Sequence, residues 1–578
     1  MSELIIDKLT TRDGSNVGAI VVSDIDELLL LNTNKEINTT AIVKDSNRGG
    51  VFNYDGAQSG VNNGGTVFNG WVRQYDGAVN VKWFGAKVDG VTDDTASINL
   101  ATISAHNTTG NGDLTTRRTI LIPAGDCVID GTVYVHKGQL LTGAGEGVTN
   151  IMSTVQTGTG RRTFLLGYSE TTQDGGGLPP IIEKMSTIGG DTSGAVIESF
   201  VAGSQVRDMF ITSCGVGIRV GSDCIVTRCI IDQGLNGILL SGQNVIISDV
   251  IMYVMNYGLT IASNTYDCQI NNCHFEYGKY NDITFADASS NIQNVSITNC
   301  QFLKNEQYAT LSDDIAFRGN GANALISGCT FRNSKGYGIA LQSGIGNEVK
   351  VIGCVFNGNK TNPAYAQSLT SKGINARYGI VTVDSCDFKN LNVHGIQCTT
   401  STDLIIKNCN YSSITSGTSF IYSSSTAASI VATNNTGDNL TPLIDVGTKG
   451  AVVKGNIDWL GAFYAEGGRT AIRVPLLYNT ALNYTYTANS NLSGNHVYRK
   501  NEIGIISKQI EFNGAEPTEY LVKTVLFSDT TFYVPQLDVQ IDFDTVGDGL
   551  NKAYGIPVYL VVSVPSSYAY LQFSADTI

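Results

Sequence analysis

One short pattern recurs along the middle of the chain and restricts its fold more than any other feature. A small or polar residue is followed by cysteine, any residue and an aromatic, and six such copies have their cysteines at Cys273, Cys300, Cys329, Cys354, Cys386 and Cys409. Each repeat also contains a second element that ends in an apolar residue, at Ile218, Ile238, Leu259, Ile283, Ile315, Ile339, Ile374 and Ile396. Elements that recur in a fixed order at this period predict a solenoid.

Between these markers, β-branched and aromatic residues occupy every second position, as in VSITNCQF and LIIKNCNY. This period is typical of β-strands, and short strands interrupted by Asn and Gly predict the sides of a coil. We therefore expect an all-β fold, a parallel β-helix whose cysteines and aromatics point inward and stack on the next coil about 4.8 Å away. Asn and Gly supply the left-handed backbone of the corners.

Composition and cysteine spacing exclude several classes of protein. The 578 residues have a net charge of −14, which disfavours a nucleic-acid partner. Twelve cysteines without a CxxC pair, and only five histidines, predict buried ladder residues with no metal and no cofactor. We find no apolar run of membrane-helix length and no secretory signal at the N-terminus, so we expect a soluble protein made in a cytoplasm.

The repeats divide the chain into three expected domains. Residues 1–78 form a short head rich in Gly and Asn, residues 79–455 form the β-helix, and residues 456–578 form an antiparallel β-sandwich. Near residue 95, one amphipathic helix is expected to cover the open end of the solenoid, with Asp93 or Asp94 as its cap and Ile98 and Ile103 on its buried side.

The segment WFGAKVDGVTDDTASINLA, with the later Pro123 to Gly125, resembles the entry to the pectate-lyase-like right-handed β-helix of bacteriophage tailspikes. The preceding GGVFNYD, GGTVFNGW and YDGAVNV resemble the segment that joins a tailspike's particle-binding end to its helix, and the likeness covers roughly residues 45–455. It implies a homotrimer on the virion tail, docked to another tail protein through its N-terminus. It also implies binding and degradation of host capsular or O-antigen polysaccharide. Catalytic residues differ among members of this family, so none is transferred.

Candidate catalytic residues come instead from the repeat. The residue before the inward Ile is glycine in six of eight repeats and aspartate in the other two, at Asp282 and Asp314. If these two side chains lie outward on neighbouring coils, one pKa should rise, as acid/base cleavage of a glycosidic bond requires. Glu276 and Glu306 lie in the same coils and complete the expected catalytic set. Each acid could also be ordinary solvated surface.

Around these acids we expect a substrate-binding groove, within one chain or between chains of a trimer. Its expected residues are Asp232, Asp313, His274, Tyr253, Tyr257, Tyr280, Tyr308 and Arg332. Hydrolysis by paired carboxylates is favoured over a lyase reaction at a uronic acid, for which Tyr280, His274, Lys279 and Arg332 could serve. A fibre that binds the glycan without cutting it is the non-enzymatic alternative.

Overall fold

The computed structural model describes residues 19–31, 39–105, 117–154, 162–167, 178–189, 194–286, 291–304, 312–342, 346–358, 372–398, 402–414, 419–423 and 429–437, and beyond these the backbone of strands between 444 and 574. The chain falls into two compact units, Met1–Thr284 and Phe285–Ile578, which are described in turn.

The first unit begins with a small mixed sheet, formed by residues 20–74. Its strands lie in the order β1-β2-β3-β5-β4, and its core packs the short helix α1 against Phe52, Phe68 and Trp71. The elements are β1 (Ile20–Val22), α1 (Ile25–Leu30), β2 (Thr40–Val43), β3 (Gly50–Tyr54), the 3-10 turn η1 (Gly56–Gln58), β4 (Val67–Phe68) and β5 (Trp71–Gln74).

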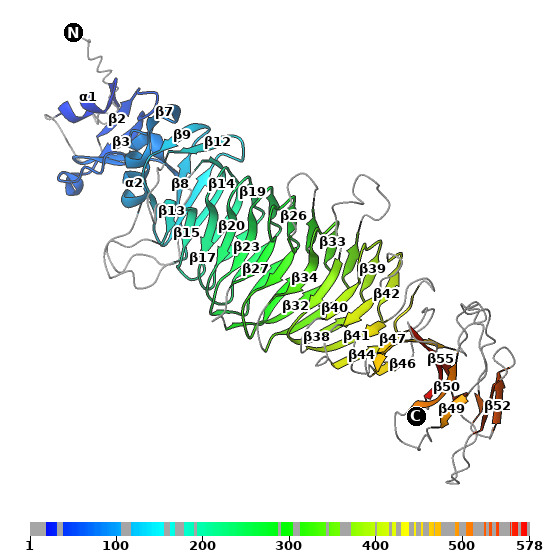
Figure 1. The fold of residues 1–578 in the computed structure, drawn as a ribbon. Coiled ribbons are helices and arrows are strands. Elements are labelled where there is room, and N and C mark those ends of the chain that lie inside the picture. The colour runs from blue at the N-terminus through cyan, green and yellow to red at the C-terminus, as the bar shows by residue number, and fades with distance from the viewer. Residues whose placement is uncertain are drawn as a thin grey trace. The chain divides into compact units, whose positions relative to one another are not determined.

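The rest of the first unit is a stack of parallel coils, seen in Figure 1 as successive strands lying side by side. One face contains β6 (Val79–Asn80), β7 (Asp89–Asp93), β8 (Arg118–Ile122), β9 (Gly125–Ile129), β11 (Gln139–Gly143), β12 (Thr149–Ser153), β14 (Ile181–Ile188), β16 (Gln205–Thr212), β18 (Ile225–Thr227), β19 (Ile230–Asp232), β21 (Ile246–Ser248), β22 (Ile251–Tyr253), β25 (Gln269–Asn271) and β26 (His274–Glu276). A second face contains β10 (Val133–Val135), β13 (Arg162–Leu166), β15 (Ala195–Ser199), β17 (Val216–Val220), β20 (Asn236–Leu240) and β23 (Tyr257–Ile261). The short β24 (Thr265–Tyr266) follows, and β27 (Ile283–Phe285) contains the boundary of the two units.

The second unit repeats this arrangement. One face contains β29 (Val295–Thr298), β30 (Gln301–Leu303), β32 (Asn323–Ser327), β33 (Thr330–Arg332), β35 (Glu348–Ile352), β36 (Val355–Asn357), β38 (Gly379–Asp384), β39 (Asp387–Lys389), β41 (Thr402–Lys407), β42 (Asn410–Ser412), β44 (Ser429–Thr433) and β46 (Val452–Lys454), after the short β28 (Ile292–Gln293). The other contains β31 (Ile315–Phe317), β34 (Tyr337–Leu341), β37 (Lys372–Ala376), β40 (Ile396–Cys398), β43 (Ile421–Ser423), β45 (Ile444–Val446) and β47 (Ala462–Glu466).

The inward stacking predicted from the repeat is confirmed. In the second unit, the rings of Phe302, Phe331, Phe356 and Phe388 stack with successive centroid distances of 4.8, 4.6 and 4.6 Å. All twelve cysteines are buried and unbridged. The residue before the repeat cysteine has a left-handed backbone, with φ of 53° at Asn272 and 56° at Asn408, which Asn tolerates better than most residues.

The expected capping helix is α2 (Thr95–Ser104), preceded by the 3-10 turn η2 (Val81–Phe84). Asn99 ties it to the first coil, because its side chain donates to the carbonyl of Thr132 and accepts from the backbone N–H of Tyr134. Ile98 is buried as predicted, but the prediction for Ile103 is wrong, since its side chain is 47% exposed. Its neighbour Thr102 is fully buried instead, one helical position away.

Asp94 is the N-cap residue of α2 but makes no side-chain hydrogen bond to the helix, and Asp93 provides the side-chain acceptor instead. Asp93 Oδ1 accepts hydrogen bonds from the backbone N–H and the hydroxyl of Thr95, whereas Asp94 accepts from the backbone N–H groups of Lys87 and Val88. Replacing Asp93 by alanine is expected to lower the free energy of unfolding by about 1 kcal/mol, since an N-terminal donor loses its acceptor. Urea unfolding beside the exposed control Asp76→Ala tests this, and equal midpoints for the two variants would contradict the capping role.

Past β47 the pairing changes from parallel to antiparallel. β47 pairs antiparallel with β48, and β55 pairs antiparallel with both β48 and β56. The strands here are β48 (Arg469–Pro475), β49 (Leu492–Asn495), β50 (Ile505–Glu511), β51 (Val525–Leu526), β52 (Thr531–Val534), β53 (Val539–Asp542), β54 (Gly555–Ile556), β55 (Val558–Val564) and β56 (Tyr568–Ser574). The β-sandwich stays a prediction. Among the described residues, no helix is long and apolar enough to span a membrane.

Candidate active site

The glycine-rich column that suggested Asp282 and Asp314 faces neighbouring coils and the core. A Cβ atom at Gly237 would lie 2.5 Å from the carbonyl oxygen of Gly258, and one at Gly338 would lie 2.9 Å from the ring of Phe356. Asp282 and Asp314 occupy this same column and are 2% and 0% exposed. The expectation that both carboxylates lie on the solvent face is therefore wrong, because the glycines mark a position where a side chain has no route to solvent.

In the second unit, Asp314 belongs to a buried polar cluster. Its carboxylate accepts a hydrogen bond of 2.5 Å from the Ser334 hydroxyl, and its Oδ1 lies 3.8 Å from Lys304 Nζ. The side chains of Lys304 and Asp314 are both fully buried. The hydrogen bond from Ser334 and the nearby Lys304 ammonium offset the cost of burying this carboxylate.

Three of the sequence-predicted residues in the first unit do form a row across adjacent coils. Asp232 of β19 is in register with Tyr253 of β22, and Tyr253 is in register with Glu276 of β26. Each is the last residue of its strand and is partly exposed. The next residue in each coil has a left-handed backbone, with φ of 53° at Gln233, 48° at Val254 and 58° at Tyr277, so the chain turns a corner directly after the row.

The row combines a carboxyl of raised pKa with a carboxylate that contacts a histidine. Burial raises the pKa of Asp232 against the opposing hydrogen bonds from Gln233. Burial also raises the pKa of Tyr253, and the charges of Glu276 and Asp232 add to that effect. Glu276 Oε1 lies 3.1 Å from His274 Nε2, two residues earlier on the same strand. The acids therefore have different environments although they occupy equivalent positions.

Two more predicted residues follow the corner. The rings of Tyr257 and Tyr280 stack with centroids 5.2 Å apart, and Lys279 Nζ lies 5.4 Å from the centre of the Tyr280 ring. Tyr257 comes four residues after Tyr253 and is the first residue of β23, so the aromatic pair lies where the next strand face begins. Such rings suit the C–H faces of sugars.

The remaining predicted residues are in the second unit or outside the described residues. Arg332 ends β33, where it is exposed, in register with Leu303 and Asn357. Asp313 is buried and accepts from the backbone N–H of Tyr337, and burial raises the pKa of its carboxyl. Glu306 and Tyr308 lie outside the described residues.

Sequence reasoning missed a second row in the second unit. Tyr337, Lys372 and His394 each precede a glycine of the glycine-rich column, in GYGI, SKGI and VHGI. Tyr337 and Lys372 are in register on β34 and β37. The Tyr337 hydroxyl donates to Gln397 Oε1, and Lys372 Nζ lies 3.5 Å from the same hydroxyl. These three side chains occupy the position directly before each glycine, whereas the predicted acids occupy the glycine position itself.

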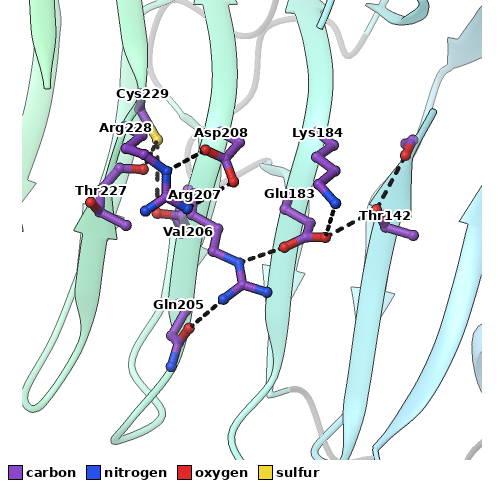
Figure 2. A network of polar contacts seen from close by, with 11 residues as sticks. Thr142, Glu183, Lys184, Gln205, Val206, Arg207, Asp208, Thr227, Arg228 and Cys229 are labelled. Carbon is purple, nitrogen blue, oxygen red and sulfur yellow. Dashed lines mark hydrogen bonds and ion pairs between the residues drawn. The ribbon is translucent and has the colours of Figure 1, made fainter. Parts of the chain in front are cut away.

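Other charges of the first unit compensate one another along the β14–β16 surface (Figure 2). Arg207 Nε lies 2.5 Å from Glu183 Oε2, and Glu183 Oε1 accepts a hydrogen bond from the Thr142 hydroxyl. Arg228 makes two hydrogen bonds to Asp208. These contacts link one coil to the next. This network holds adjacent coils together, and none of its residues belongs to the Asp232–Tyr253–Glu276 row.

Comparison with protein families identifies two segments. Residues 293–457 match the family model "Right handed beta helix region", and residues 78–189 match "Rhamnogalacturonase A/epimerase, pectate lyase-like". The right-handed, pectate-lyase-like β-helix expected from the sequence is confirmed. No curated protein matches the chain.

Solved structures that resemble the chain come from phages and from bacteria. The N-terminal fragment of bacteriophage Phi29 gene product 12 is 16% identical, covers 71% of this chain and 75% of its own, and has a TM-score of 0.49. The gp42 tailspike of Acinetobacter phage vb_AbaP_AS12 is 12% identical, with coverages of 96% and 94% and a TM-score of 0.42. The catalytic unit of the GH87 α-1,3-glucanase of Streptomyces thermodiastaticus is 16% identical, with coverages of 67% and 70% and a TM-score of 0.46.

Proposed function

We propose that the chain binds and hydrolyses a polysaccharide, with Asp232 as general acid and Glu276 as general base. The observation that supports this proposal is the in-register row Asp232–Tyr253–Glu276. Asp232 and Glu276 are two strand spacings apart, about 9–10 Å between their Cα atoms. Carboxyl groups about 6.5–9.5 Å apart leave room for a water and suit hydrolysis with inversion.

In this reaction Asp232 donates its proton to the glycosidic oxygen as the bond to the anomeric carbon breaks. Glu276 takes a proton from the water that attacks the opposite face of that carbon. A raised pKa suits the acid, because the carboxyl must still hold its proton near neutral pH. Glu276 is ionised when it accepts the proton, and His274 at 3.1 Å orients it.

The three tyrosines near this row are proposed to bind the sugar rings. Tyr253 lies between the two acids in the row, and Tyr257 and Tyr280 form a stacked pair after the corner. Buried and half-buried aromatic rings with a polar hydroxyl offer both an apolar face and a hydrogen-bonding edge. Asp282 and Asp314 are assigned structural roles because both are buried.

The biological setting we propose is a bacteriophage tail. The sequence resemblance over residues 45–455 supports a homotrimeric tailspike attached to another tail protein through residues 1–78, acting on host capsular or O-antigen polysaccharide. The pectate-lyase-like match over residues 78–189 supports the same class of β-helix.

The purified full chain, incubated with a panel of bacterial capsular and O-antigen polysaccharides, tests this function. Hydrolysis predicts saturated oligosaccharides whose masses include one added water. Products with an unsaturated uronate, which absorb near 235 nm, would replace hydrolysis by a lyase reaction. Tight binding without any product would support a non-catalytic fibre instead.

The raised pKa of Asp232 predicts where kcat/KM falls on the alkaline side of its pH profile. Because the general acid must be protonated, kcat/KM should fall as the pH rises through the raised pKa of Asp232. Replacing Gln233 by leucine removes the side-chain hydrogen bond that lowers this pKa, leaves the backbone hydrogen bond in place, and should move this alkaline limb to higher pH. An alkaline limb that stays in place in Gln233→Leu would contradict Asp232 as the titrating acid.

A further inference from the structure

The strand face formed by β34, β37, β40 and β43 in the second unit contains two cations that form no ion pair within the described part of the chain. Lys304, Lys350, Lys389 and Lys407 each lie within 4.0 Å of a carboxylate. No such ion pair involves Lys372 or Arg377 among the residues that the structure describes. Lys372 is the first residue of β37 and Arg377 directly follows that strand, so two cations that form no ion pair with a described residue lie at its two ends.

Lys372 is held in place by an aromatic ring. Its Nζ lies 4.7 Å from the centre of the Tyr337 ring and 3.5 Å from the Tyr337 hydroxyl. That hydroxyl donates to Gln397 Oε1, two strands further along the face. Burial lowers the pKa of Lys372, and the charge of the nearby Asp313 carboxylate opposes this shift.

Arg377 follows the same strand, β37, and is close enough for its charge to act on the Tyr337 hydroxyl. Its Nε is buried and has no hydrogen-bond partner among the described residues. Asn375, two residues earlier, has a buried Oδ1 that also lacks a partner there. Asn375 is in register with Gln397 and Tyr422, and the Tyr422 ring stacks on His394 with centroids 4.4 Å apart.

We propose that this face is a binding site for a carboxylate-bearing sugar residue of a polysaccharide, separate from the Asp232–Tyr253–Glu276 row. The sugar carboxylate binds Lys372 and Arg377, whose N–H donors match its oxygens. The site gives the chain selectivity for acidic over neutral glycans, and its binding chemistry does not depend on whether the first unit is a hydrolase.

The chemistry of the face favours an acidic sugar over a phosphate or sulfate ion. A sulfate or hydrogen phosphate ion could bind the two cations, but it has no apolar C–H face. A uronic acid presents a carboxylate for the two cations together with ring hydroxyls and a C–H face. The aromatic pair His394–Tyr422 offers an apolar surface for the C–H face of a sugar ring.

The test uses the full chain with ¹³C-methylated lysines, whose Lys372 signal is assigned by its absence in Lys372→Arg. Titration with the methyl glycoside of glucuronic acid should shift this signal, and methyl glucoside should leave it unmoved. An unmoved signal with the glucuronide would overturn the proposal. Inorganic phosphate that shifts the signal with equal affinity would also overturn it, since the site would then be a general anion site.

Variants add a second readout of the same claim. Lys372→Met should weaken glucuronide binding by about tenfold, as expected for the loss of one charge-assisted contact, whereas Lys372→Arg should retain most of it. The matched control is Lys350→Met, because Lys350 is exposed and paired with Glu348. Equal affinities for Lys372→Met and Lys350→Met would contradict the site. Failure of glycan cleavage with intact glucuronide binding would count against the proposed hydrolase alone.

Discussion

Replacing Asp232 by asparagine or Glu276 by glutamine should each lower kcat for glycan cleavage by about 10²- to 10⁴-fold, the usual contribution of a general acid or base. Both substitutions keep the size of the side chain, and both residues are partly exposed at strand ends, so the coil should fold unchanged. The measurement is the rate of release of new reducing ends from the polysaccharide that the wild-type chain cleaves. Binding of that polysaccharide should change little, because the loss is in the transition state.

Two comparisons make this expectation specific. Glu348→Gln removes an acid of β35 that pairs with Lys350, and it should retain nearly full activity. The double variant Asp232→Asn with Glu276→Gln should be far less impaired than the product of the single losses, since the two groups act in one step. If either single variant keeps activity within a few-fold of wild type, the assignment of that residue is wrong.

Replacing Asp314 by alanine should destabilise the second unit by about 3–5 kcal/mol, because the Lys304 ammonium is then buried without its carboxylate. The Ser334 hydroxyl also loses the acceptor of its 2.5 Å hydrogen bond. Urea or thermal unfolding of the full chain, followed by circular dichroism, measures this loss.

The double variant Asp314→Ala with Lys304→Met provides the control for this buried pair. Removing both charges leaves neither one uncompensated, so the double variant should be considerably more stable than Asp314→Ala alone. A double variant as unstable as the sum of the two single variants would show that the pair is not coupled. An Asp314→Ala variant that unfolds like wild type while cleavage is lost would return Asp314 to a catalytic role.

The architecture followed from the sequence because each coil repeats one physical requirement. A strand side that packs inward needs apolar residues at every second position, and stacking along the axis needs the same residue type at the same place, as Phe331 and Phe356 illustrate. The left-handed corner needs Asn or Gly, as at Asn272. These requirements are local, so they are visible in the repeat.

The candidate site was harder to predict, because burial at a corner depends on the neighbouring coil. A column of glycines shows only that a side chain has little room. The repeat pattern predicts an outward Asp314, whereas the structure buries it with Lys304. The contact between Tyr337 and Gln397 joins residues 60 positions apart, and no local pattern indicates it. By contrast, Asp232, Tyr253 and Glu276 were all among the residues expected in the site or its groove, and each directly follows an inward aliphatic or aromatic residue of its own coil.

The measurement that tests the central claim most directly is ¹H NMR of the cleavage reaction during its first turnovers, before the new reducing end mutarotates. A water activated by Glu276 on the face opposite the bond protonated by Asp232 predicts a product with inverted anomeric configuration. A product with retained configuration would require two carboxyl groups closer together than Asp232 and Glu276, and an unsaturated product would require no attacking water. Either of those results would contradict the assignment of this row as an inverting acid/base pair.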